Sequence, residues 1–418
     1  MRAASLRRRA AGLLTAFCLA AAGVLLPAAV PASAAGTLDP VPSFGSNPGN
    51  LGMYRYVPAA LPAGSPVVVL LHGCGQSAPE YVEYSGWQKF ADAHGFSLVA
   101  AEQRTANNSS RCFNWFETGD TSRGQGEALS IRQMVDRTVS DLGADPDRVF
   151  VTGLSAGGAM TASLLAVYPD AFAGGAVIAG LPHRCATSMI DAFTCMNPGR
   201  TRTAQAWGDL VRAGHPGHQG ARPPVSVWHG GADYVVATAN MTESVKQWTN
   251  AHGTDQAADA TEQLPANTTR SEYHDAAGQP VVISYLLAGA GHGTPVDPGT
   301  GATQCGRTGG YFLAGLCSSY WIAADWGLTG EGPGPDPDPE PDPEPDPDPE
   351  PEPDPDPEPP LSCHTASNWA HTQAGRATHS GGRAYAVGSG DDLGLWNVFV
   401  TTSLTETSPG HYSRTAGC

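Results

Sequence analysis

Several features that would place this 418-residue chain in a familiar class are missing from it. Beyond the N-terminus no apolar run is long enough to span a bilayer, which argues against a multi-spanning membrane protein. Lys and Arg form no basic patch, so we expect no nucleic-acid partner. No Cys-x-x-Cys pair and no convincing internal repeat occur, which argues against a zinc module and a repeat array.

The net charge of −17 is concentrated in one segment. Thirteen acidic residues and no basic residue lie between Glu331 and Pro360, where Pro alternates with Asp or Glu. The rest of the chain carries 27 acidic and 23 basic residues, so it is only mildly acidic. An alternating Pro chain favours extended polyproline II, and about 26 such residues reach on the order of 80 Å. We predict a linker over residues 330–360, either tuned in length or simply a solvated spacer.

The first 34 residues have the pattern of a secretory signal peptide. Arg2 and Arg7–Arg9 give a positive start, an apolar stretch follows, and Ala-Ser-Ala at 32–34 is a small-residue cleavage site. A membrane anchor is the alternative, but Pro27 and Pro31 interrupt the apolar run. The three consecutive arginines leave twin-arginine export open beside the general secretory route. We predict a secreted, extracellular protein with no membrane partner.

Cysteine usage fits an exported chain. Cys18 lies in the predicted signal peptide, and the eight cysteines that remain favour disulfides in an oxidising compartment. Eight cysteines allow about a hundred pairings, so the connectivity does not follow from the sequence. Pairing of neighbours is our hypothesis, and metal binding is the alternative. The hypothesis joins Cys74 with Cys112, Cys185 with Cys195, Cys305 with Cys317, and Cys363 with Cys418.

Residues 35–329 alternate short apolar runs with amphipathic ones, which predicts an α/β fold with a mostly parallel sheet covered on both faces. The helical spacing of Ile131, Met134 and Val135 predicts a helix that Gly143 ends, and Gly95 ends another over 86–95. Strands are indicated by the runs PVVVLLHG (66–73), FSLVAAE (96–102), RVFVTG (148–153), VSVWHG (225–230) and VVISYLL (281–287). Residues 361–418, with a cysteine near each end, predict a small β-rich module closed by one disulfide.

The stretch GLSAGGAM (153–160) contains Gly-x-Ser-x-Gly between a predicted strand and a predicted helix. That is the context of a nucleophile elbow, in which the serine occupies a cramped turn and the glycines allow close backbone approach. The helix N-terminus would favour a developing oxyanion. With 51 glycines in the chain, an ordinary Gly-rich turn is the alternative. We predict Ser155 as the nucleophile.

A serine nucleophile needs a base and a residue that orients the base, in the order Ser, Asp, His for an α/β-hydrolase. Asp233 follows the predicted strand 225–230, and His292 follows the strand 281–287 in a Gly-rich loop. Both lie where an open α/β sheet builds its site, although Asp233 could be a plain turn residue. We expect most of the competing histidines to be exposed to solvent. They are His183, His215, His218, His229, His252 and His274.

The predicted chemistry is acyl transfer to Ser155, with His292 as the base and Asp233 fixing the histidine tautomer. The oxyanion hole should combine the backbone N–H of Ala156 with one from the loop LLHGCGQ, in which Cys74 lies. His72 is either part of the scaffold of this hole or simply a histidine at a strand end. The mechanism needs no metal and no organic cofactor.

Several motifs in order resemble the extracellular poly(3-hydroxybutyrate) depolymerases and the related feruloyl and acetylxylan esterases. They are LHGCGQ, RCFNWFE, DPDRVFVTGLSAGGAM, WHGGADYVV and GAGHG, and they span roughly residues 51–326. The resemblance implies an α/β-hydrolase domain, the triad Ser155, Asp233 and His292, and an oxyanion role for His72. It also supports pairing of Cys74 with Cys112. The motif CFNWF departs from the expected Trp beside the cysteine, but Phe113 keeps a ring there.

The C-terminal segment is similar to the substrate-binding domain of the same depolymerases. That resemblance implies adsorption to a polyester surface through aromatic rings, for which we name Trp369, Tyr385 and Trp396 as candidates. The alternative is that these rings, and Phe399, only form the core of a small module.

The sequence therefore predicts a secreted serine esterase that hydrolyses insoluble poly(3-hydroxybutyrate) or a related short-chain polyhydroxyalkanoate, with the granule surface as its partner. A feruloyl or acetylxylan esterase with a carbohydrate-binding module is the first alternative. A catalytically silent surface-binding protein is the second, and the complete Ser155, Asp233 and His292 set argues against it. The sequence leaves the oligomeric state open, with a monomer expected.

Overall fold

A computed structural model describes residues 36–330, 362–397 and 399–418. The predicted signal peptide and almost all of the predicted linker lie outside the described residues. The chain divides into two compact units, Met1–Asp338 and Pro339–Cys418. We call the first the catalytic unit, because it contains the predicted Ser155, Asp233 and His292, and the second the tail unit. The point of division lies inside the acidic Pro-rich segment, and each unit is described by itself.

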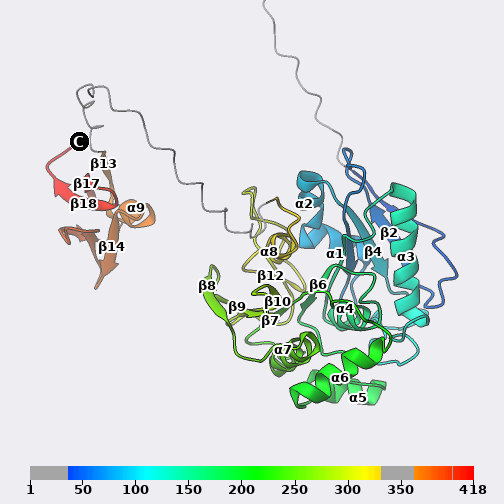
Figure 1. Ribbon diagram of the computed structural model, residues 1–418. Coiled ribbons are helices and arrows are strands. Elements are labelled where there is room, and N and C mark those ends of the chain that lie inside the picture. The colour runs from blue at the N-terminus through cyan, green and yellow to red at the C-terminus, as the bar shows by residue number, and fades with distance from the viewer. Residues whose placement is uncertain (1–35, 331–361, 398) are drawn as a thin grey trace, which may run out of the picture. The chain divides into compact units, whose positions relative to one another are not determined.

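The catalytic unit is built on a ten-stranded sheet (Figure 1). Its central strands are parallel, while antiparallel pairs extend it at both edges. In spatial order the strands are β1 (Leu38–Pro40), β2 (Gly52–Tyr56), β4 (Ser97–Glu102), β3 (Val67–Leu71), β5 (Val149–Leu154), β6 (Gly174–Ile178), β7 (Val225–Gly230), β10 (Pro280–Leu287), β9 (Thr268–His274) and β8 (Ala260–Leu264). The strands predicted from the apolar runs all form, and this is the predicted α/β architecture.

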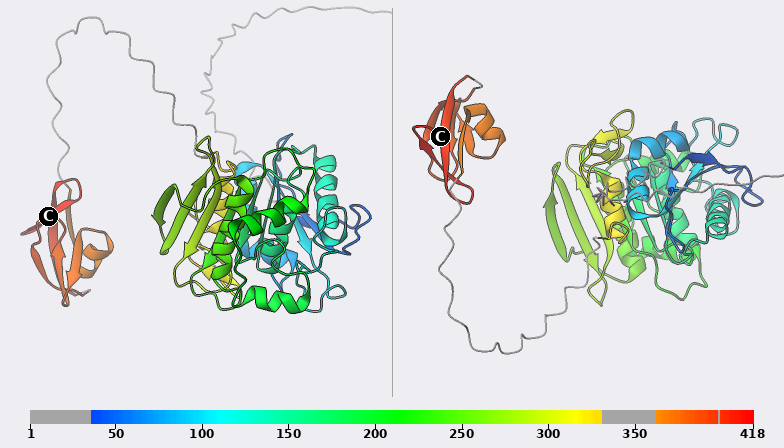
Figure 2. Two further views of the ribbon diagram at one scale, coloured as in Figure 1. Left: turned by 60° about the horizontal axis from the view of Figure 1, so that its bottom comes forward. Right: turned by 90° about the horizontal axis from the view of Figure 1, so that it is seen from above.

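The central strands are apolar on both faces because helices cover both (Figure 2). In β3, Val67 and Val69 face one hydrophobic cluster, and Val68 and Leu70 point the opposite way, into a second cluster. The first cluster is completed by helices α3 (Gly126–Leu142), α4 (Ala156–Val167), α6 (Ala204–Gly214) and α7 (Ala239–His252). The second is completed by α1 (Ala78–Ser85), α2 (Trp87–His94) and α8 (Ser318–Asp325). This alternation follows from the two-residue period of a strand, and it explains why these segments read as continuous apolar runs.

The helices have sequence-encoded ends. Gly95 and Gly143 adopt the left-handed conformation at the C-terminal ends of α2 and α3, as predicted, with φ of 71° and 60°. The helices of the unit are α1 (Ala78–Ser85), α2 (Trp87–His94), α3 (Gly126–Leu142), α4 (Ala156–Val167), α5 (Met189–Met196), α6 (Ala204–Gly214), α7 (Ala239–His252) and α8 (Ser318–Asp325). A short parallel pair, β11 (Thr294–Val296) and β12 (Phe312–Ala314), lies beyond the main sheet.

The tail unit consists of two three-stranded sheets and one short helix, α9 (Asn368–Gln373). One sheet contains β13 (Cys363–Ser367), β17 (Thr401–Ser408) and β18 (His411–Thr415). The other contains β14 (Ala377–Ser380), β15 (Arg383–Ala386) and β16 (Asp392–Leu395). This agrees with the β-rich module predicted for this segment.

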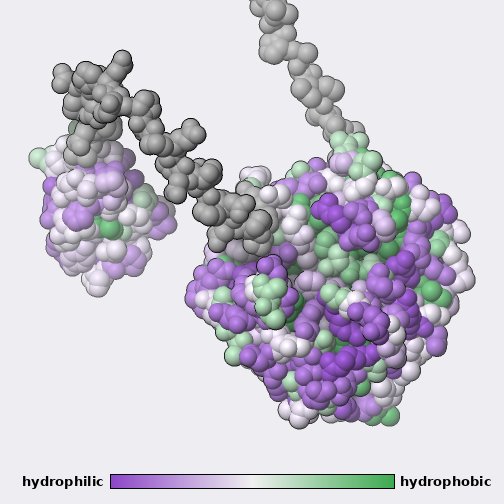
Figure 3. Space-filling model, in the orientation of Figure 1, coloured by the Kyte–Doolittle hydropathy of each residue, from purple (hydrophilic) through white to green (hydrophobic). Residues whose placement is uncertain are grey.

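The eight cysteines are joined as the neighbour pairs of the sequence hypothesis. Cys74–Cys112, Cys185–Cys195 and Cys305–Cys317 lie in the catalytic unit, and Cys363–Cys418 closes the tail unit across 55 residues of sequence. The face of the two units drawn in Figure 3 is a mosaic of hydrophilic and hydrophobic residues. None of the helices in the described ranges is long and apolar enough to cross a membrane.

Candidate active site

Ser155 occupies the sharp turn between β5 and α4. Its φ of 56° is a conformation that residues other than glycine rarely adopt, and the following residue, Ala156, begins the helix. The turn is held by a hydrogen bond from the backbone N–H of Ser155 to the carbonyl of Ile178 in β6, at 2.8 Å. The serine is therefore presented at the C-terminal edge of the parallel strands, in a backbone conformation typical of a nucleophile elbow.

The glycines around Ser155 are required by close backbone contacts. A Cβ at Gly153 would lie 2.6 Å from the backbone of Gly157, and one at Gly157 would lie 2.6 Å from the carbonyl oxygen of His72. Real Cβ atoms essentially never approach backbone atoms this closely. A side chain at either position would therefore push α4 away from the strands that it contacts.

Asp233 and His292 meet at the ends of β7 and β10. The Nδ1–H of His292 donates to Oδ2 of Asp233 at 2.7 Å, which leaves Nε2 of the ring as an acceptor. Oδ1 of Asp233 accepts the backbone N–H groups of Val235 and Val236, at 2.9 Å each. Burial opposes ionisation of Asp233, but the bonds from His292 and Val236 outweigh it and hold its pKa below the usual value.

Ser155 and His292 line the same cavity, of about 140 Å³, together with Gly73, Cys74 and Tyr311. No hydrogen bond joins the Ser155 hydroxyl to the His292 ring among the described residues. This contact is often loose in free enzymes and tightens when substrate binds. The arrangement therefore has the parts of a Ser-His-Asp triad in the chain order of an α/β-hydrolase.

The expectation that the competing histidines are mostly exposed is wrong. His183 and His229 are buried, and the other four are partly buried. His229 lies in β7 itself, with Nε2 contacting the carbonyl of Val236 at 2.9 Å. Burial lowers the pKa of His183 to about 3 and also lowers that of His229. A lone histidine in the sequence carries no signal of burial, because its neighbours decide whether the strand or helix around it faces inward.

Two backbone N–H groups remain as candidate oxyanion donors. Ala156 is the first residue of α4, where N–H groups have no partner within the helix. In the loop after β3, the N–H of Gly73 is taken by the side chain of Gln76 and that of Gly75 by the carbonyl of Ser110. Within the part of the chain that the structure describes, the Cys74 N–H has no acceptor, so it is the loop donor that could meet an oxyanion.

His72 lies beneath that loop and does not face the cavity. Its Nε2 accepts the backbone N–H of Gln103 at 3.1 Å, so Nδ1 carries the proton and contacts the carbonyl of Gly73 at 2.7 Å. Its ring packs against Phe113, with 5.1 Å between centroids. Burial lowers the pKa of His72 to about 4, which keeps the ring neutral. The sequence left open whether His72 supports the oxyanion hole or is simply a histidine at a strand end. These contacts with the loop favour the supporting role.

A second cavity, of about 620 Å³, shares Cys74 and Met196 with the first, so the two adjoin. Trp115, Phe116 and Phe193 supply apolar walls. Polar side chains from residues 107–110 and Asn114 line the remainder. The combined space is suited to a substrate longer than one acyl group, with both apolar and hydrogen-bonding surfaces.

The combination of an elbow serine, a His-Asp pair and free backbone donors agrees with comparisons to known proteins. The family described as esterase PHB depolymerase matches residues 51–275, which is more than half of the chain. The chain belongs to that family. It is therefore a carboxylic-ester hydrolase.

Individual relatives of this family member are esterases as well. It is 52% identical over 313 residues to a poly(3-hydroxyalkanoate) depolymerase C of Paucimonas lemoignei, a match that covers 75% of each chain. It is 34% identical over 275 residues to a feruloyl esterase B of Talaromyces funiculosus, covering 64% of this chain and 76% of the relative. A solved acetyl xylan esterase from Aspergillus awamori matches with a TM-score of 0.57 and 30% identity, covering 62% of this chain and 94% of that structure. This similarity identifies the α/β-hydrolase fold.

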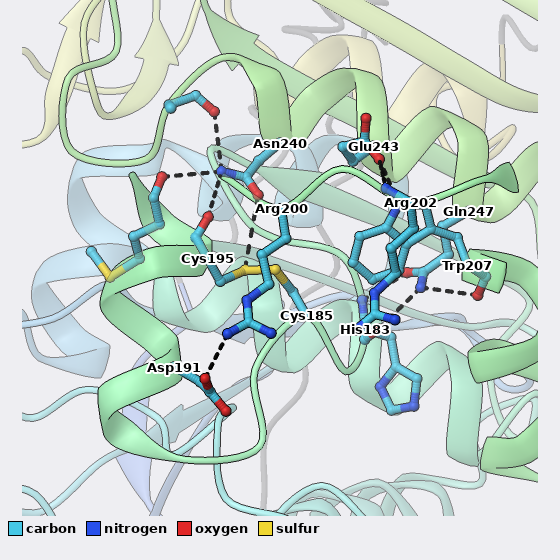
Figure 4. The surroundings of a disulfide bond; sticks show 12 residues. His183, Cys185, Asp191, Cys195, Arg200, Arg202, Trp207, Asn240, Glu243 and Gln247 are labelled. Carbon is cyan, nitrogen blue, oxygen red and sulfur yellow. Dashed lines mark hydrogen bonds and ion pairs between the residues drawn. A yellow bond between two sulfur atoms is a disulfide. The ribbon is translucent and has the colours of Figure 1, made fainter. Parts of the chain in front are cut away.

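Helix α5 contributes Met189, Phe193 and Met196 to the walls of the cavities in this esterase. Figure 4 shows the contacts that anchor this helix. The disulfide Cys185–Cys195 ties the helix to the preceding loop, and the side-chain N–H₂ of Asn240 donates to the carbonyl of Cys195 at 3.0 Å. Arg200 pairs with Asp191 in the same helix at 2.5 Å. These contacts hold α5 in place while its outer side chains remain in solvent.

The large apolar side chains that the catalytic unit leaves exposed gather around this site. On α5 they are Met189, Ile190 and Phe193, of which Ile190 is 84% exposed. Tyr234 and Val235 follow β7, and Tyr311 lies against the His292 ring, with 6.0 Å between centroids. We call these six residues the apolar rim, since four of them line the two cavities and the other two are their sequence neighbours. The sequence did not reveal the rim, because the exposure of these side chains depends on how α5 and the loops after β7 and β11 pack, which no local pattern encodes.

The tail rings predicted to bind polymer differ in exposure. Trp369 is 43% exposed, whereas Tyr385 and Trp396 are partly buried. The Trp396 indole stacks on His379, with 3.9 Å between ring centroids. Phe399 is 89% exposed, and Leu395 is 57% exposed. The alternative that these rings only form a core therefore does not hold for Trp369 or Phe399.

Metal ligands are not gathered anywhere in the described ranges. No group of three or more His, Cys, Asp or Glu side chains in residues 36–330, 362–397 and 399–418 could hold a metal ion. The structure thus brings Ser155, Asp233, His292, Cys74 and Ala156 to one edge of the sheet, with His72 behind the loop. The tail candidates belong to the other unit.

Proposed function

We propose that this esterase is secreted and hydrolyses the ester bonds of an insoluble short-chain polyhydroxyalkanoate such as poly(3-hydroxybutyrate). Family membership and the 52% identical depolymerase relative support the polyester class. The predicted N-terminal signal and four disulfides support export. The proposed site consists of Ser155, Asp233 and His292, with the N–H groups of Cys74 and Ala156 as the oxyanion hole.

The reaction begins at the Ser155 hydroxyl. Nε2 of His292 accepts its proton while the serine oxygen attacks the ester carbonyl, and the resulting oxyanion lies between the Cys74 and Ala156 N–H groups. As the intermediate collapses, the ester C–O bond breaks, and the imidazolium donates its proton to the leaving alkoxide oxygen, which departs as a hydroxyl end of the polymer chain. A water molecule, deprotonated by the same histidine, hydrolyses the acyl-enzyme and restores the serine.

Asp233 sets the histidine tautomer that this sequence requires. Because ionised Asp233 can only accept hydrogen bonds, Nδ1 of His292 must carry the proton that lies between them. The two backbone donors to the other oxygen of Asp233 fix its orientation and favour its charged form. The carboxylate therefore stabilises the imidazolium that forms during attack.

The observation that carries the choice of an insoluble substrate is the apolar rim. Exposed apolar patches rimmed by polar surface mark sites that contact another apolar surface. Here Val235 and Tyr311 line the cavity that contains Ser155, and Met189 and Phe193 line the adjoining cavity. A solid polyester that covers these side chains therefore also presents ester bonds to the serine. A soluble substrate would not need Ile190 or Tyr234, which are 84% and 85% exposed outside the cavities.

The tail unit is proposed to hold the polymer surface. A backbone hydrogen bond from Trp369 to the carbonyl of Asn397, at 3.1 Å, places the backbone of Trp369 beside the segment that follows β16. Leu395 ends β16, and Phe399 lies in the segment after it. These two side chains and Trp369 are exposed, and we call the three residues the tail patch. Leu395 and Phe399 replace Tyr385 and Trp396 as the main candidates, because the latter two are partly buried.

A feruloyl or acetylxylan esterase remains the second candidate. The amide and hydroxyl side chains of residues 107–110 in the larger cavity are groups that could bind sugar hydroxyls. Adsorption of the full chain to polyester granules, xylan and cellulose separates the two candidates. Retention on granules supports the polyester, and retention on xylan alone would favour the carbohydrate ester.

The test of the proposed function is clearing of a poly(3-hydroxybutyrate) suspension. We expect the full chain to clear it, Ser155→Ala to adsorb without clearing, and a chain ending at Glu331 to clear slowly because adsorption is weaker. Clearing by Ser155→Ala would show that the nucleophile is wrong. Unchanged adsorption and clearing by the shortened chain would show that the tail unit has another role.

A further inference from the structure

The loop that carries the candidate oxyanion donor is made of residues with much backbone freedom. Cys74 lies between Gly73 and Gly75, and Gly75 has a φ of 77° with no atom near the place of a Cβ. An oxyanion donor must nevertheless be held at hydrogen-bonding distance from a position that only the transition state occupies. Some part of the structure outside the loop must therefore restrain it.

Gln103, the residue that follows β4, contacts two of the restraints on this loop. Its backbone N–H binds Nε2 of His72, whose Nδ1 in turn contacts the carbonyl of Gly73. Its side-chain N–H₂ donates to the carbonyl of Cys112 at 3.0 Å, and Cys112 is joined to Cys74 by the disulfide. Gln103 is therefore connected to the loop in two ways. The His72 ring links it to Gly73, and the Cys74–Cys112 disulfide links it to Cys74 itself.

Glu127, in the first turn of α3, fixes the side chain of Gln103. Its Oε1 accepts the Gln103 side-chain N–H₂, and it also accepts the side-chain N–H₂ of Asn114 at 2.8 Å. Its Oε2 accepts the backbone N–H of Asn114 at 2.9 Å. Gln103 and Glu127 are at most 1% exposed, and neither has a step in the proposed reaction.

A buried carboxyl is costly to retain for packing alone. Burial, reinforced by the nearby charge of Asp120, raises the pKa of Glu127 to about 8 despite its three N–H donors. Buried polar groups of this kind make a unique geometry when every member is satisfied. All hydrogen-bonding atoms of the Gln103 side chain are used, since its Oε1 accepts the Arg104 N–H at 3.0 Å and the Asn107 side chain at 2.8 Å.

We propose that Gln103 and Glu127 are positioning residues that hold the Cys74 N–H in the oxyanion hole through His72 and through the Cys74–Cys112 disulfide. This role rests on the proposed function of Ser155 and of the oxyanion hole. The residues act on the transition state and not on the bound substrate, because the N–H that they restrain meets charge only after attack. Their loss therefore lowers kcat and leaves KM nearly unchanged.

The test compares Gln103→Met and Glu127→Met with the full wild-type chain on a soluble p-nitrophenyl ester. Each variant removes the side-chain hydrogen bonds with little change in volume. Displacement of the Cys74 N–H by about 1 Å should lower the rate about 10- to 100-fold. We expect kcat to fall by that factor, KM to change by less than about twofold, and the inhibition constant of an alkyl boronic acid, which mimics the tetrahedral intermediate, to rise in parallel.

Asp325→Asn is the matched control. Asp325 is another acid of low exposure, with 9% of its side chain exposed. It accepts the Tyr285 hydroxyl at 2.9 Å and pairs with Arg270, and among the described residues it makes no contact with the Gly73–Gly75 loop. This control should lower the melting temperature without changing kcat at 25 °C or the affinity for the boronic acid. It separates a general loss of stability from a loss of positioning.

Two results distinguish failure of this inference from failure of the proposed function. Full activity of Ser155→Ala would overturn the proposed function and the positioning role with it. An inactive Ser155→Ala together with wild-type kcat and boronic acid affinity in Gln103→Met and Glu127→Met would overturn the positioning role alone. If Gln103→Met does not fold, Glu127→Met, which keeps both the backbone bond to His72 and the Gln103 side chain, decides the test.

Discussion

The catalytic unit and the tail unit place their large aromatic side chains differently. In the tail unit, Trp369 and Phe399 are 43% and 89% exposed, and the buried hydrophobic cluster contains only alanines and two leucines. Two buried polar residues, Asn368 and His371, tie α9 to the strands through hydrogen bonds to backbone carbonyls. In the catalytic unit four tryptophans are fully buried in the core, namely Trp87, Trp207, Trp228 and Trp248.

This difference follows from the size of the hydrophobic core in each unit. The catalytic unit has two large clusters to stabilise it, so it can confine exposed apolar side chains to the rim of its site. The tail unit has a core too small to supply most of its stability, and its disulfide must contribute a larger share. Its large rings are consequently available to a surface. The predictions below test this contrast, from the largest expected effect to the smallest.

The largest effect is expected from Asp233→Asn in the catalytic unit. An asparagine can donate to His292 and so stabilises the wrong tautomer, which should lower kcat on the order of 10⁴-fold. Hydrolysis of a soluble ester and of polymer should fall together, while adsorption to granules stays unchanged. A loss of less than tenfold in initial rates at saturating ester would contradict the assignment of Asp233.

Replacement of Cys363 and Cys418 by Ser should affect the tail unit alone. Loss of a native disulfide from a small secreted domain costs about 2–5 kcal/mol, which is comparable with the whole stability of such a unit. We expect calorimetry to lose the transition of the tail unit and adsorption to granules to fall, with soluble-ester hydrolysis intact. The matched double replacement of Cys305 and Cys317 should lower the stability of the catalytic unit and leave adsorption by the tail unit unchanged.

In the apolar rim, Ile190→Ser and Tyr234→Ser together should lower polymer clearing about tenfold. Burial of a large apolar side chain against a surface contributes about 1.5–3 kcal/mol when complete, and only part of this is realised on a flat solid. The rate on a soluble ester should fall much less, because neither side chain lines the cavities. Equal losses on both substrates would show that the rim serves the fold or the chemistry instead.

The tail patch should show a smaller effect. Phe399→Ser is expected to weaken adsorption of the full chain about fivefold, which corresponds to about 1 kcal/mol of lost contact. Tyr385→Phe is the control, since it keeps a ring at a partly buried position. Binding isotherms on granules measure both variants, and a stronger effect from the tyrosine would reverse the assignment of the binding face.

Glu127 should make the stability of the catalytic unit fall as the pH rises toward 8. Its pKa is raised in the folded state to about 8, so the folded state binds a proton more tightly than the unfolded chain does. The contribution of this group is fully present below the unfolded pKa and is lost as pH rises through about 8. Denaturant unfolding between pH 5 and 8.5 should show this decline, and Glu127→Gln should flatten it.

Much of the fold was predictable, because the information lies in local patterns. The buried strands are continuous apolar runs, the helix ends have glycines, and the elbow serine has its flanking glycines within six residues. Asp233 and His292 could be found since each follows a predicted strand, and parallel strands end at one edge of a sheet. Their contact spans 59 positions of sequence and still follows from that rule.

The remainder depended on contacts that no local pattern encodes. Gln103 and Glu127 have the sequence signals of an ordinary loop residue and an ordinary helix N-terminal acid, and only the packing of α3 against β4 buries them together. Burial of His183 and His229, against expectation, has the same origin. The exposure of Phe399 could not be predicted, because an aromatic residue in a small module can lie in the core or on the surface.

The most direct test of the account is the product released by the full chain from a solid polyester and from acylated xylan at equal enzyme concentration. The account predicts soluble 3-hydroxybutyrate or its short oligomers from poly(3-hydroxybutyrate) granules, none of them from the Ser155→Ala chain, and far slower release of acetate or ferulate from xylan. Rapid release of acetate or ferulate with intact granules would contradict it.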